Sequence, residues 1–150
     1  MPAWRRILCA VDLSEPSRAA LRDAAQIARD CNAELTLLHV SKIGKPMTGA
    51  DPFVPDIDTV MREDREALEA ELQPWREEAA RIADRAVTVT IVHGSPADEI
   101  VKFAGERFDL VVVATHGRTG VRRLVLGSVA EHVVRESSVP VLVVRVPAPK

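Results

Sequence analysis

Aromatic side chains are scarce in this sequence, which has no tyrosine, two tryptophans and three phenylalanines in 150 residues. An excess of positive charge is also missing, because 20 Lys and Arg oppose 22 Asp and Glu, for a formal net charge of −2. Proteins that bind nucleic acids use basic surfaces against the phosphates and aromatic rings on which the bases stack. The sequence therefore predicts no nucleic-acid partner.

Cysteines and long apolar runs are scarce as well. The only cysteines, Cys9 and Cys31, have no CxxC spacing, which predicts free thiols in a reducing compartment rather than a disulfide or a zinc site. The first apolar run, ILCAV, ends at Asp12, and is too short for the core of a signal peptide or for a membrane span. We expect a cytoplasmic protein without a membrane partner.

Length and composition are those of an ordinary globular protein, with 47% hydrophobic and 28% charged residues. A chain of this size can bury about two-thirds of the surface that it exposes when unfolded. No internal repeat is visible, and the one shift in composition is a stretch rich in proline and glycine. We predict a single domain over residues 1–150, with a flexible connection over about 41–57.

Short apolar runs alternate with amphipathic segments along the chain. Strands are predicted over residues 6–12, 34–40, 87–92, 110–115 and 141–146. Helices are predicted after the N-cap residues Ser14, Ser95 and Ser128. A further helix, around residues 68–82, is expected to be interrupted or kinked near Pro74, and the last helix is expected to end at Pro140.

This alternation predicts an α/β fold, a parallel sheet with helices on both faces and right-handed crossovers. In an open sheet of this kind, ligands bind at the carboxyl ends of the strands, where the strand order reverses. Asp12, Val40 and the 114–120 segment all lie at such strand ends.

Glycines precede the last predicted helix at a regular motif spacing. Gly117 and Gly120 follow a buried strand, and Gly127 with Ser128 opens the helix. Without a Cβ atom the main-chain N–H groups can approach an oxyanion, and the N-terminus of a helix attracts anions. The segment is therefore interpreted as a phosphate clamp. The Walker motif GxxxxGK[ST] and the dinucleotide motif GxGxxG are both absent.

Simpler roles remain open for several of these residues. Ser128 fits a capping box with Glu131, and Asp12 is equally suited to capping a helix and to contacting a ligand.

Among Arg118, Arg122 and Arg123, Arg118 is favoured for contacting a phosphate because it adjoins Gly117. His39, His93 and His116 each lie at or just after the end of a predicted strand, but no metal-ligand spacing joins them, so no metal site is predicted.

Catalytic patterns are missing from the sequence. There is no nucleophile elbow, no pair of carboxylates at a spacing typical of acid–base catalysis and no activated cysteine. No catalytic residue is assigned.

The chain resembles the universal stress proteins along nearly its whole length. The resemblance rests on ILCAVDLSEPSRAAL, LTLLHV, GSPADEI and, above all, ATHGRTGVRRLVLGSVAEHVVRESSVPVLVVR. Nucleotide-binding members of that family carry G-x-x-G, nine residues and G-[S/T]. Gly117, residues 118–126 and Gly127-Ser128 match this pattern, whereas its first glycine is replaced by Ala114. A methyl group there either is tolerated or displaces a phosphate.

The resemblance implies a five-stranded parallel sheet of order 3-2-1-4-5, with ATP between the first and fourth strands, in a homodimer built partly through the fifth strand. Mg²⁺ or Mn²⁺ would be held mainly by the phosphates. By position, Ala10, Asp12 and Val40 would lie beside the adenosine. The residues implied around the phosphates are Ala114, His116, Gly117, Arg118, Gly127, Ser128 and Val129.

The function that this resemblance implies is that of an ATP-binding sensor or adaptor in the stress response. Two alternatives stay open. One is a dimeric interaction module of the same fold that binds no nucleotide, and the other is a slow ATPase.

Overall fold

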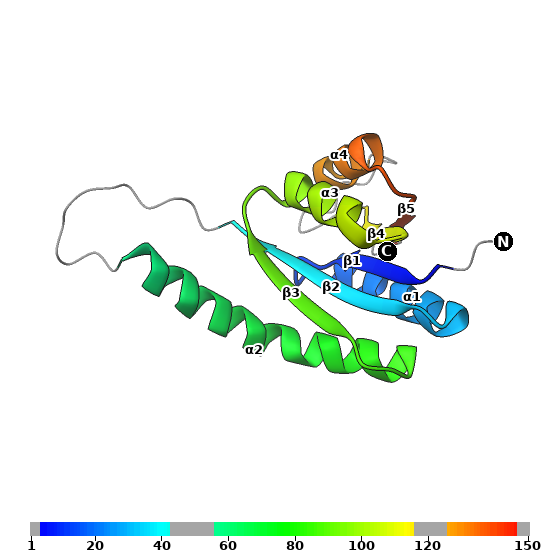
Figure 1. The fold of residues 1–150 in the computed structure, drawn as a ribbon, viewed down its shortest axis with the longest axis horizontal. Coiled ribbons are helices and arrows are strands. Elements are labelled where there is room, and N and C mark those ends of the chain that lie inside the picture. The colour runs from blue at the N-terminus through cyan, green and yellow to red at the C-terminus, as the bar shows by residue number, and fades with distance from the viewer. Residues whose placement is uncertain (1–3, 43–55, 116–125, 147–150) are drawn as a thin grey trace.

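The computed structural model describes residues 4–42, 56–115 and 126–146. In chain order the elements are β1 (Arg6–Ala10), α1 (Glu15–Cys31), β2 (Glu34–Ser41), α2 (Ile57–Ala83), β3 (Thr88–His93), α3 (Pro96–Arg107), β4 (Leu110–Ala114), α4 (Ser128–Glu136) and β5 (Val141–Val144). The strands form one parallel sheet of order β3-β2-β1-β4-β5 (Figure 1). The predicted α/β fold and strand order are confirmed.

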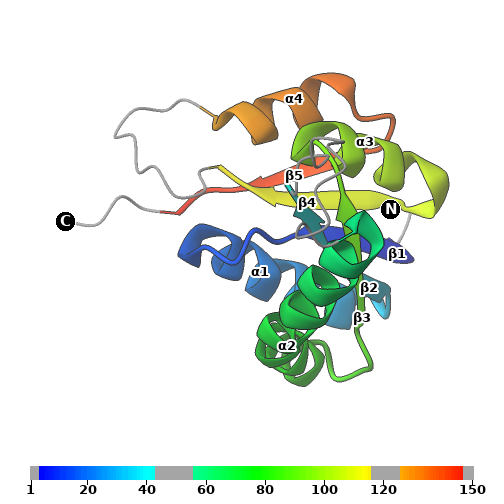
Figure 2. The same cartoon turned by 90° about the vertical axis from the view of Figure 1, so that its left-hand side faces the viewer.

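The helices cover both faces of the sheet. Figure 2 shows α1 and α2 on one side and α3 and α4 on the other. Each side has its own hydrophobic cluster, because neighbouring residues of a strand point to opposite faces. In β4, for example, Val112 belongs to the cluster under α1 and α2, and Val111 to the cluster under α3 and α4.

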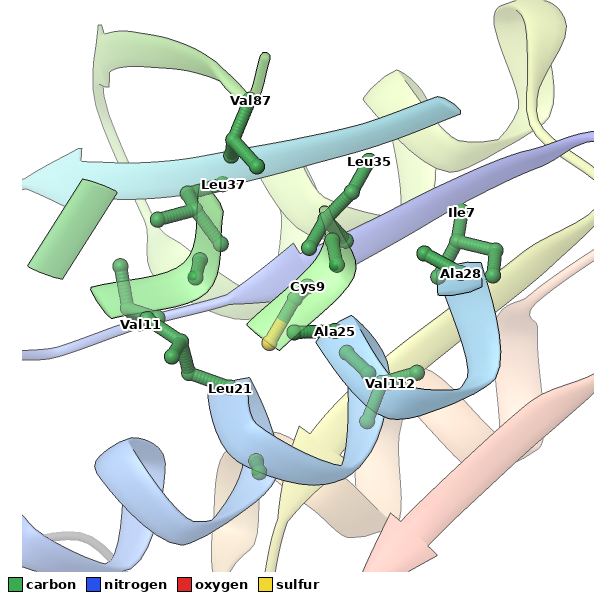
Figure 3. Close-up of a cluster of buried hydrophobic side chains, with 14 of the residues drawn as sticks. Ile7, Cys9, Val11, Leu21, Ala25, Ala28, Leu35, Leu37, Val87 and Val112 are labelled. Atoms are coloured by element: carbon green, nitrogen blue, oxygen red, sulfur yellow. The ribbon is translucent and has the colours of Figure 1, made fainter. Parts of the chain in front are cut away.

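The cluster under α1 and α2 is the larger of the two (Figure 3). Helix α1 contributes Leu21 and a row of small residues, among them Ala24, Ala25 and Ala28, all fully buried. Their small side chains let the helix approach the sheet closely, so that Cys9 is enclosed between the two layers. Burial, and next the charge of Asp23, raises the pKa of the Cys9 thiol to about 12.

The predicted start of α1 is confirmed. Ser14 is the N-cap, and its hydroxyl oxygen accepts a hydrogen bond of 3.3 Å from the Ser17 N–H. Asn32 closes the helix in the left-handed conformation, with φ of 54°. This helix therefore begins and ends where the local sequence directs.

The second helix is predicted to be interrupted or kinked near Pro74, and the interruption is contradicted. Helix α2 runs without a break over 27 residues, with Pro74 inside it. Pro74 is exposed, while Leu72 and Trp75 on either side of it are buried in the core. Packing of these flanking residues compensates for the main-chain hydrogen bond that proline cannot make. Of the predicted 41–57 connection, residues 43–55 lie outside the described residues.

Strand and helix ends differ from the predictions by a few residues. Both β1 and β5 stop earlier than predicted, at Ala10 and Val144, and β3 extends to His93. Helix α4 ends at Glu136 rather than at Pro140. There the Ser137 hydroxyl accepts a hydrogen bond from the Val139 N–H at 3.1 Å, forming a turn that ends the helix before the proline.

Candidate functional site

A pocket of about 490 Å³ opens at the carboxyl edge of the sheet. Strand β1 lies there between β2 and β4, so that the chain crosses in opposite directions on its two sides. This is the topological switch point at which open α/β sheets bind ligands. The volume is within the range of small-molecule sites.

All of the predicted site residues that the structure describes line this pocket. They are Ala10, Asp12, Val40, Ala114, Gly127, Ser128 and Val129. The other predicted residues, His116, Gly117 and Arg118, lie outside the described residues. The pocket is thus formed by the ends of β1, β2 and β4, the turn after β1 and the start of α4.

Asp12 forms the turn that joins β1 to α1. Its Oδ1 accepts a hydrogen bond from the Ser14 N–H at 3.0 Å and another from the Ser14 hydroxyl. Its own N–H donates to Ser17 Oγ at 3.2 Å. Leu13, between Asp12 and Ser14, has a φ of 66°, which is rare for a residue other than glycine. The turn therefore holds Asp12 at the pocket at the cost of local backbone strain.

Ala114 replaces the glycine expected at the end of β4, and its methyl group faces away from the pocket's apolar wall. The residue pairs with Val144 in the sheet, and its side chain packs against the cluster under α1 and α2. The apolar pocket wall is on the opposite face, where Val113, Ala10 and Val40 belong to the cluster under α3 and α4. Ala114 therefore offers its main chain rather than its methyl group to this wall.

The predicted capping box at the start of α4 is wrong. The N-cap is Gly127, without a side-chain capping bond, and Ser128 is already helical. The reason is a long-range contact: the Gly127 N–H donates to the Thr115 carbonyl at 2.6 Å, which places the helix start against the end of β4. Glu131 instead forms an ion pair with Arg135. The Ser128 hydroxyl is thus not used as the cap of α4.

The first turn of α4 faces the pocket, since the residues from Gly127 to Ala130 all line it. The first N–H groups of a helix have no partner within the helix, and the helix dipole makes this end positive. An anion in the pocket would therefore be stabilised by α4. The contact of Gly127 with Thr115 also brings together the two ends of the glycine-containing segment.

Several pocket residues were not predicted. Pro96 and Ile100 come from the start of α3, and Ser17 from the first turn of α1. The available signal was that α3 follows β3, so that its N-terminus must lie at the same edge of a parallel sheet. His39 also lines the pocket, and its ring Nδ1 lies 2.8 Å from the Val11 carbonyl oxygen, joining the ends of β1 and β2.

The histidines do not gather at a metal site in the part of the chain that is described. There, no three His, Cys, Asp or Glu side chains are grouped so that they could hold a metal ion. His93 lies beside Asp64 of α2, with Nε2 3.2 Å from Oδ2. Across the same described ranges, no helix has the length and apolar character needed to traverse a membrane.

The sheet order and the pocket define a doubly wound α/β protein with a pocket at the switch point. Comparison with known proteins identifies the family. The universal stress protein family matches residues 3–145 of the chain. The chain belongs to this family.

Individual relatives agree with this assignment. The universal stress protein YxiE of Bacillus subtilis is 34% identical over 148 residues, which cover 95% of this chain and 99% of YxiE. The structure of the universal stress protein UspA from Lactobacillus plantarum has a TM-score of 0.76 at 27% identity, covering 97% of this chain and 100% of that one. A universal stress protein in complex with cAMP has a TM-score of 0.68, also at 27% identity, with 97% and 99% covered.

Proposed function

We propose that this protein binds an adenine nucleotide, ATP in the first place, in the pocket at the carboxyl edge of the sheet. We further propose that it acts as a nucleotide-dependent sensor or adaptor in the stress response. The observation that carries the proposal is the juxtaposition of the N-terminus of α4 with the ends of β1, β2 and β4 around one pocket. The similarity to a universal stress protein in complex with cAMP supports it.

The pocket has two chemically different sides. Ala10, Val40 and Val113 supply apolar surface on the α3 and α4 face of the sheet, which suits an adenine ring, and Asp12 supplies a carboxylate for a ribose hydroxyl. On the other side, the main chain of Gly127 and Ser128 faces the phosphates. We assign His116, Gly117 and Arg118 to the phosphates as well, from the sequence motif alone.

A divalent cation, Mg²⁺ or Mn²⁺, would accompany the phosphates. Because the described residues hold no group of three His, Cys, Asp or Glu side chains for a metal, the phosphate oxygens would be its main ligands. Such an ion would neutralise part of the phosphate charge.

The proposed molecule is a homodimer in the cytoplasm. Strand β5 lies at one edge of the sheet, where Val141, Leu142 and Val143 remain partly exposed. An unprotected apolar edge strand favours pairing with another chain. The free cysteines, Cys9 and Cys31, fit a reducing compartment.

Nucleotide binding is tested by denaturing the purified protein and separating the released nucleotides, together with thermal denaturation at increasing ATP and Mg²⁺. We expect released ATP and a rise of the melting temperature with ATP concentration. Gly127→Asp should abolish this rise, because its carboxylate repels the phosphates at the start of α4, while the ligand-free protein stays folded. The φ of −57° at Gly127 is accessible to aspartate.

Ser138→Asp is the matched control, since it adds the same charge just past the opposite end of α4, at an exposed position. It should retain the full ATP-dependent rise. A Gly127→Asp variant that is still stabilised by ATP would contradict the assignment of the phosphate site. A parent protein that neither releases nor responds to adenine nucleotides would favour the interaction module instead.

A further inference from the structure

Three polar side chains are buried in the part of the chain that is described: Ser17, Ser41 and Thr115. All three line the pocket at the carboxyl edge of the sheet. Burial of a hydroxyl group lowers stability unless the group is hydrogen-bonded, so a serine in such a place requires an explanation. Ser17 is the most deeply buried of the three, at 3% exposed, and its hydroxyl group bonds to the turn that carries Asp12.

Packing alone does not explain a serine at position 17. The residues that follow it on the buried face of α1 are apolar and mostly small, beginning with Ala20, Leu21 and Ala24. Figure 3 shows Leu21 and Ala25 of this row within the apolar cluster. Alanine would fill the place of Ser17 equally well and has the higher helix propensity. The hydroxyl group therefore has a role other than filling the core.

The Ser17 hydroxyl group meets the chain where it leaves the sheet after β1. The Val11 N–H still donates to the Leu38 carbonyl of β2, at 2.9 Å. The next N–H, that of Asp12, donates to Ser17 Oγ instead, at 3.2 Å. The same hydroxyl group donates to the Ser14 carbonyl at 3.0 Å. Ser17 thus joins the two ends of the turn between β1 and α1.

Within this turn, only one oxygen of the Asp12 carboxylate is used. Its Oδ1 accepts hydrogen bonds from the Ser14 N–H, at 3.0 Å, and from the Ser14 hydroxyl group. Among the described residues, none donates a hydrogen bond to Oδ2. Because Asp12 is exposed and lines the pocket, Oδ2 is available to a donor group of a ligand. Such a bond to a carboxylate is roughly twice as strong as one between neutral groups.

The turn is held in place against backbone strain. Leu13 has a φ of 66°, a conformation that persists only where the surroundings impose it. Its side chain packs against the cluster under α1 and α2, and the bonds of Ser14 and Ser17 hold the main chain around it. Without the Ser17 hydroxyl group, the Asp12 N–H would lose its partner, and the carboxylate would no longer be fixed at the pocket.

The ribose is the part of a nucleotide that suits this carboxylate. Phosphates are repelled by it, and the apolar wall of Ala10, Val40 and Val113 suits the adenine ring. The ribose hydroxyl groups are hydrogen-bond donors that carry no charge. A carboxylate oxygen fixed at the pocket would therefore distinguish nucleotides by these hydroxyl groups.

We propose that Ser17 is a positioning residue of the nucleotide pocket: it holds the turn that presents the free Asp12 oxygen to the ribose, and the site thereby selects ribonucleotides over nucleotides that lack the ribose hydroxyl groups. This inference rests on the proposed function and adds to it the class of nucleotide that the site prefers.

The test measures the dissociation constants of ATP and of its dideoxy analogue, which lacks both ribose hydroxyl groups, by titration calorimetry. The quantity compared is the ratio of the two constants, because losses that affect both nucleotides equally cancel in it. We expect the parent to bind ATP about tenfold more tightly than the analogue, the effect of one hydrogen bond to a carboxylate. This preference should fall to about twofold in Ser17→Ala and disappear in Asp12→Ala.

A double-mutant cycle separates positioning from a purely structural role. If Ser17 acts through Asp12, Ser17→Ala should weaken ATP binding in the parent but not in the Asp12→Ala background. Ser137→Ala is the matched control, since the Ser137 hydroxyl group also donates one hydrogen bond, to the Val139 carbonyl at 2.8 Å, and accepts one, from the Val139 N–H at 3.1 Å. It lies past the end of α4 that is remote from the pocket, and it should keep the full preference for ATP.

The outcomes separate this inference from the proposed function. Equal losses for both nucleotides in Ser17→Ala, or an unchanged preference, would overturn the positioning role and leave nucleotide binding standing. Equal affinity of the parent for ATP and the analogue would overturn the inference alone, because Asp12 would not contact the ribose. Absence of binding of either nucleotide would overturn the proposed function as well.

A second variant covers the case in which Ser17→Ala does not fold. Ser17→Cys keeps a side chain of similar shape, but its thiol is a weak hydrogen-bond donor and acceptor. It should lower the preference for ATP in the same direction as Ser17→Ala. An unchanged preference in Ser17→Cys would overturn the positioning role.

Discussion

The two faces of the sheet are each covered by two helices, but they are packed differently. Under α1 and α2 the buried cluster continues from Leu35 and Leu37 of β2 to Trp75 of α2 and encloses Cys9. Under α3 and α4 the cluster is smaller, and at the carboxyl edge it gives way to the pocket. One face is filled by side chains, and the other leaves room for a ligand next to helix N-termini.

Helix length and direction explain the difference. The 27 residues of α2 and the 17 of α1 cover their face and contact each other, whereas α3 and α4 have 12 and 9 residues. Both short helices begin at the pocket, with Pro96 and Ser128 in its lining. Free N–H groups and open space therefore occur together on this side, which is what an anionic ligand requires.

Strand β2 allows the two faces to be compared within one element, and the largest effect is expected there. Leu37 is fully buried under α1 and α2, so Leu37→Ala should lower the free energy of unfolding by about 3 kcal/mol. Its effect on ATP affinity should be small. Urea denaturation and calorimetry measure the two quantities.

Val40, three residues further along β2, is partly buried on the pocket face. Val40→Ala should show the opposite balance, with a stability loss of about 1 kcal/mol and about fivefold weaker ATP binding, from the lost apolar contact. If Leu37→Ala weakened binding as much as Val40→Ala does, the two faces would not be functionally separate.

A smaller effect is expected from the polar contact between α1 and α2. Glu78 forms ion pairs with Arg18 at 2.9 Å and Arg22 at 2.6 Å, and the Arg18 guanidinium lies 5.0 Å from the centre of the Trp75 ring. Burial acts to raise the pKa of Glu78, but the hydrogen bonds and charges of the two arginines outweigh it and hold the pKa below its usual value. The two arginines therefore stabilise the ionised form of Glu78.

Because the folded-state pKa of Glu78 is lowered, its contribution to stability is present above the unfolded-state value of about 4.3. It is lost as the pH falls through the folded-state pKa. Glu78→Gln should thus reduce the free energy of unfolding by about 1 kcal/mol at neutral pH and have little effect in acid. Denaturation curves at several pH values measure this. Glu71→Gln, at an exposed position of the same helix, should show neither effect.

The smallest effect is expected from restoring the motif glycine at the end of β4. Ala114→Gly should leave ATP affinity unchanged, because the methyl group packs toward the α1 and α2 cluster. It should destabilise the protein by about 0.5 kcal/mol, since glycine loses more conformational freedom on folding. Ala10→Gly, at the end of β1 on the pocket face, is the comparison variant and should weaken binding. Markedly tighter binding by Ala114→Gly would show that the methyl group obstructs the ligand.

Much of the fold could be predicted from local patterns. The alternation of apolar strands and amphipathic helices identified the α/β class, and Ser14 with Pro16 located the start of α1. The strand order came from the resemblance to the family rather than from periodicity. The failures, at Pro74 and at Ser128, occurred where contacts between distant segments override a local preference.

The candidate site was predictable at the strand ends and where a motif marks it, but not at the start of α3. Gly127 and Ser128 were identified from the spacing of the glycines, but the contribution of α3 through Pro96 and Ile100 was missed. No spacing rule connects the start of α3 with the end of β1. They meet because all strands of a parallel sheet end at the same edge.

The amino-acid sequence alone determined the elements and the glycine-containing segment, because side-chain periodicity, caps and turns act over a few residues. Only the tertiary structure decided that Gly127 caps α4, that the Ala114 methyl group faces away from the apolar pocket wall, and that Asp64 meets His93. Asp64 and His93 are 29 residues apart. Such contacts depend on how whole elements pack together, which no local pattern records.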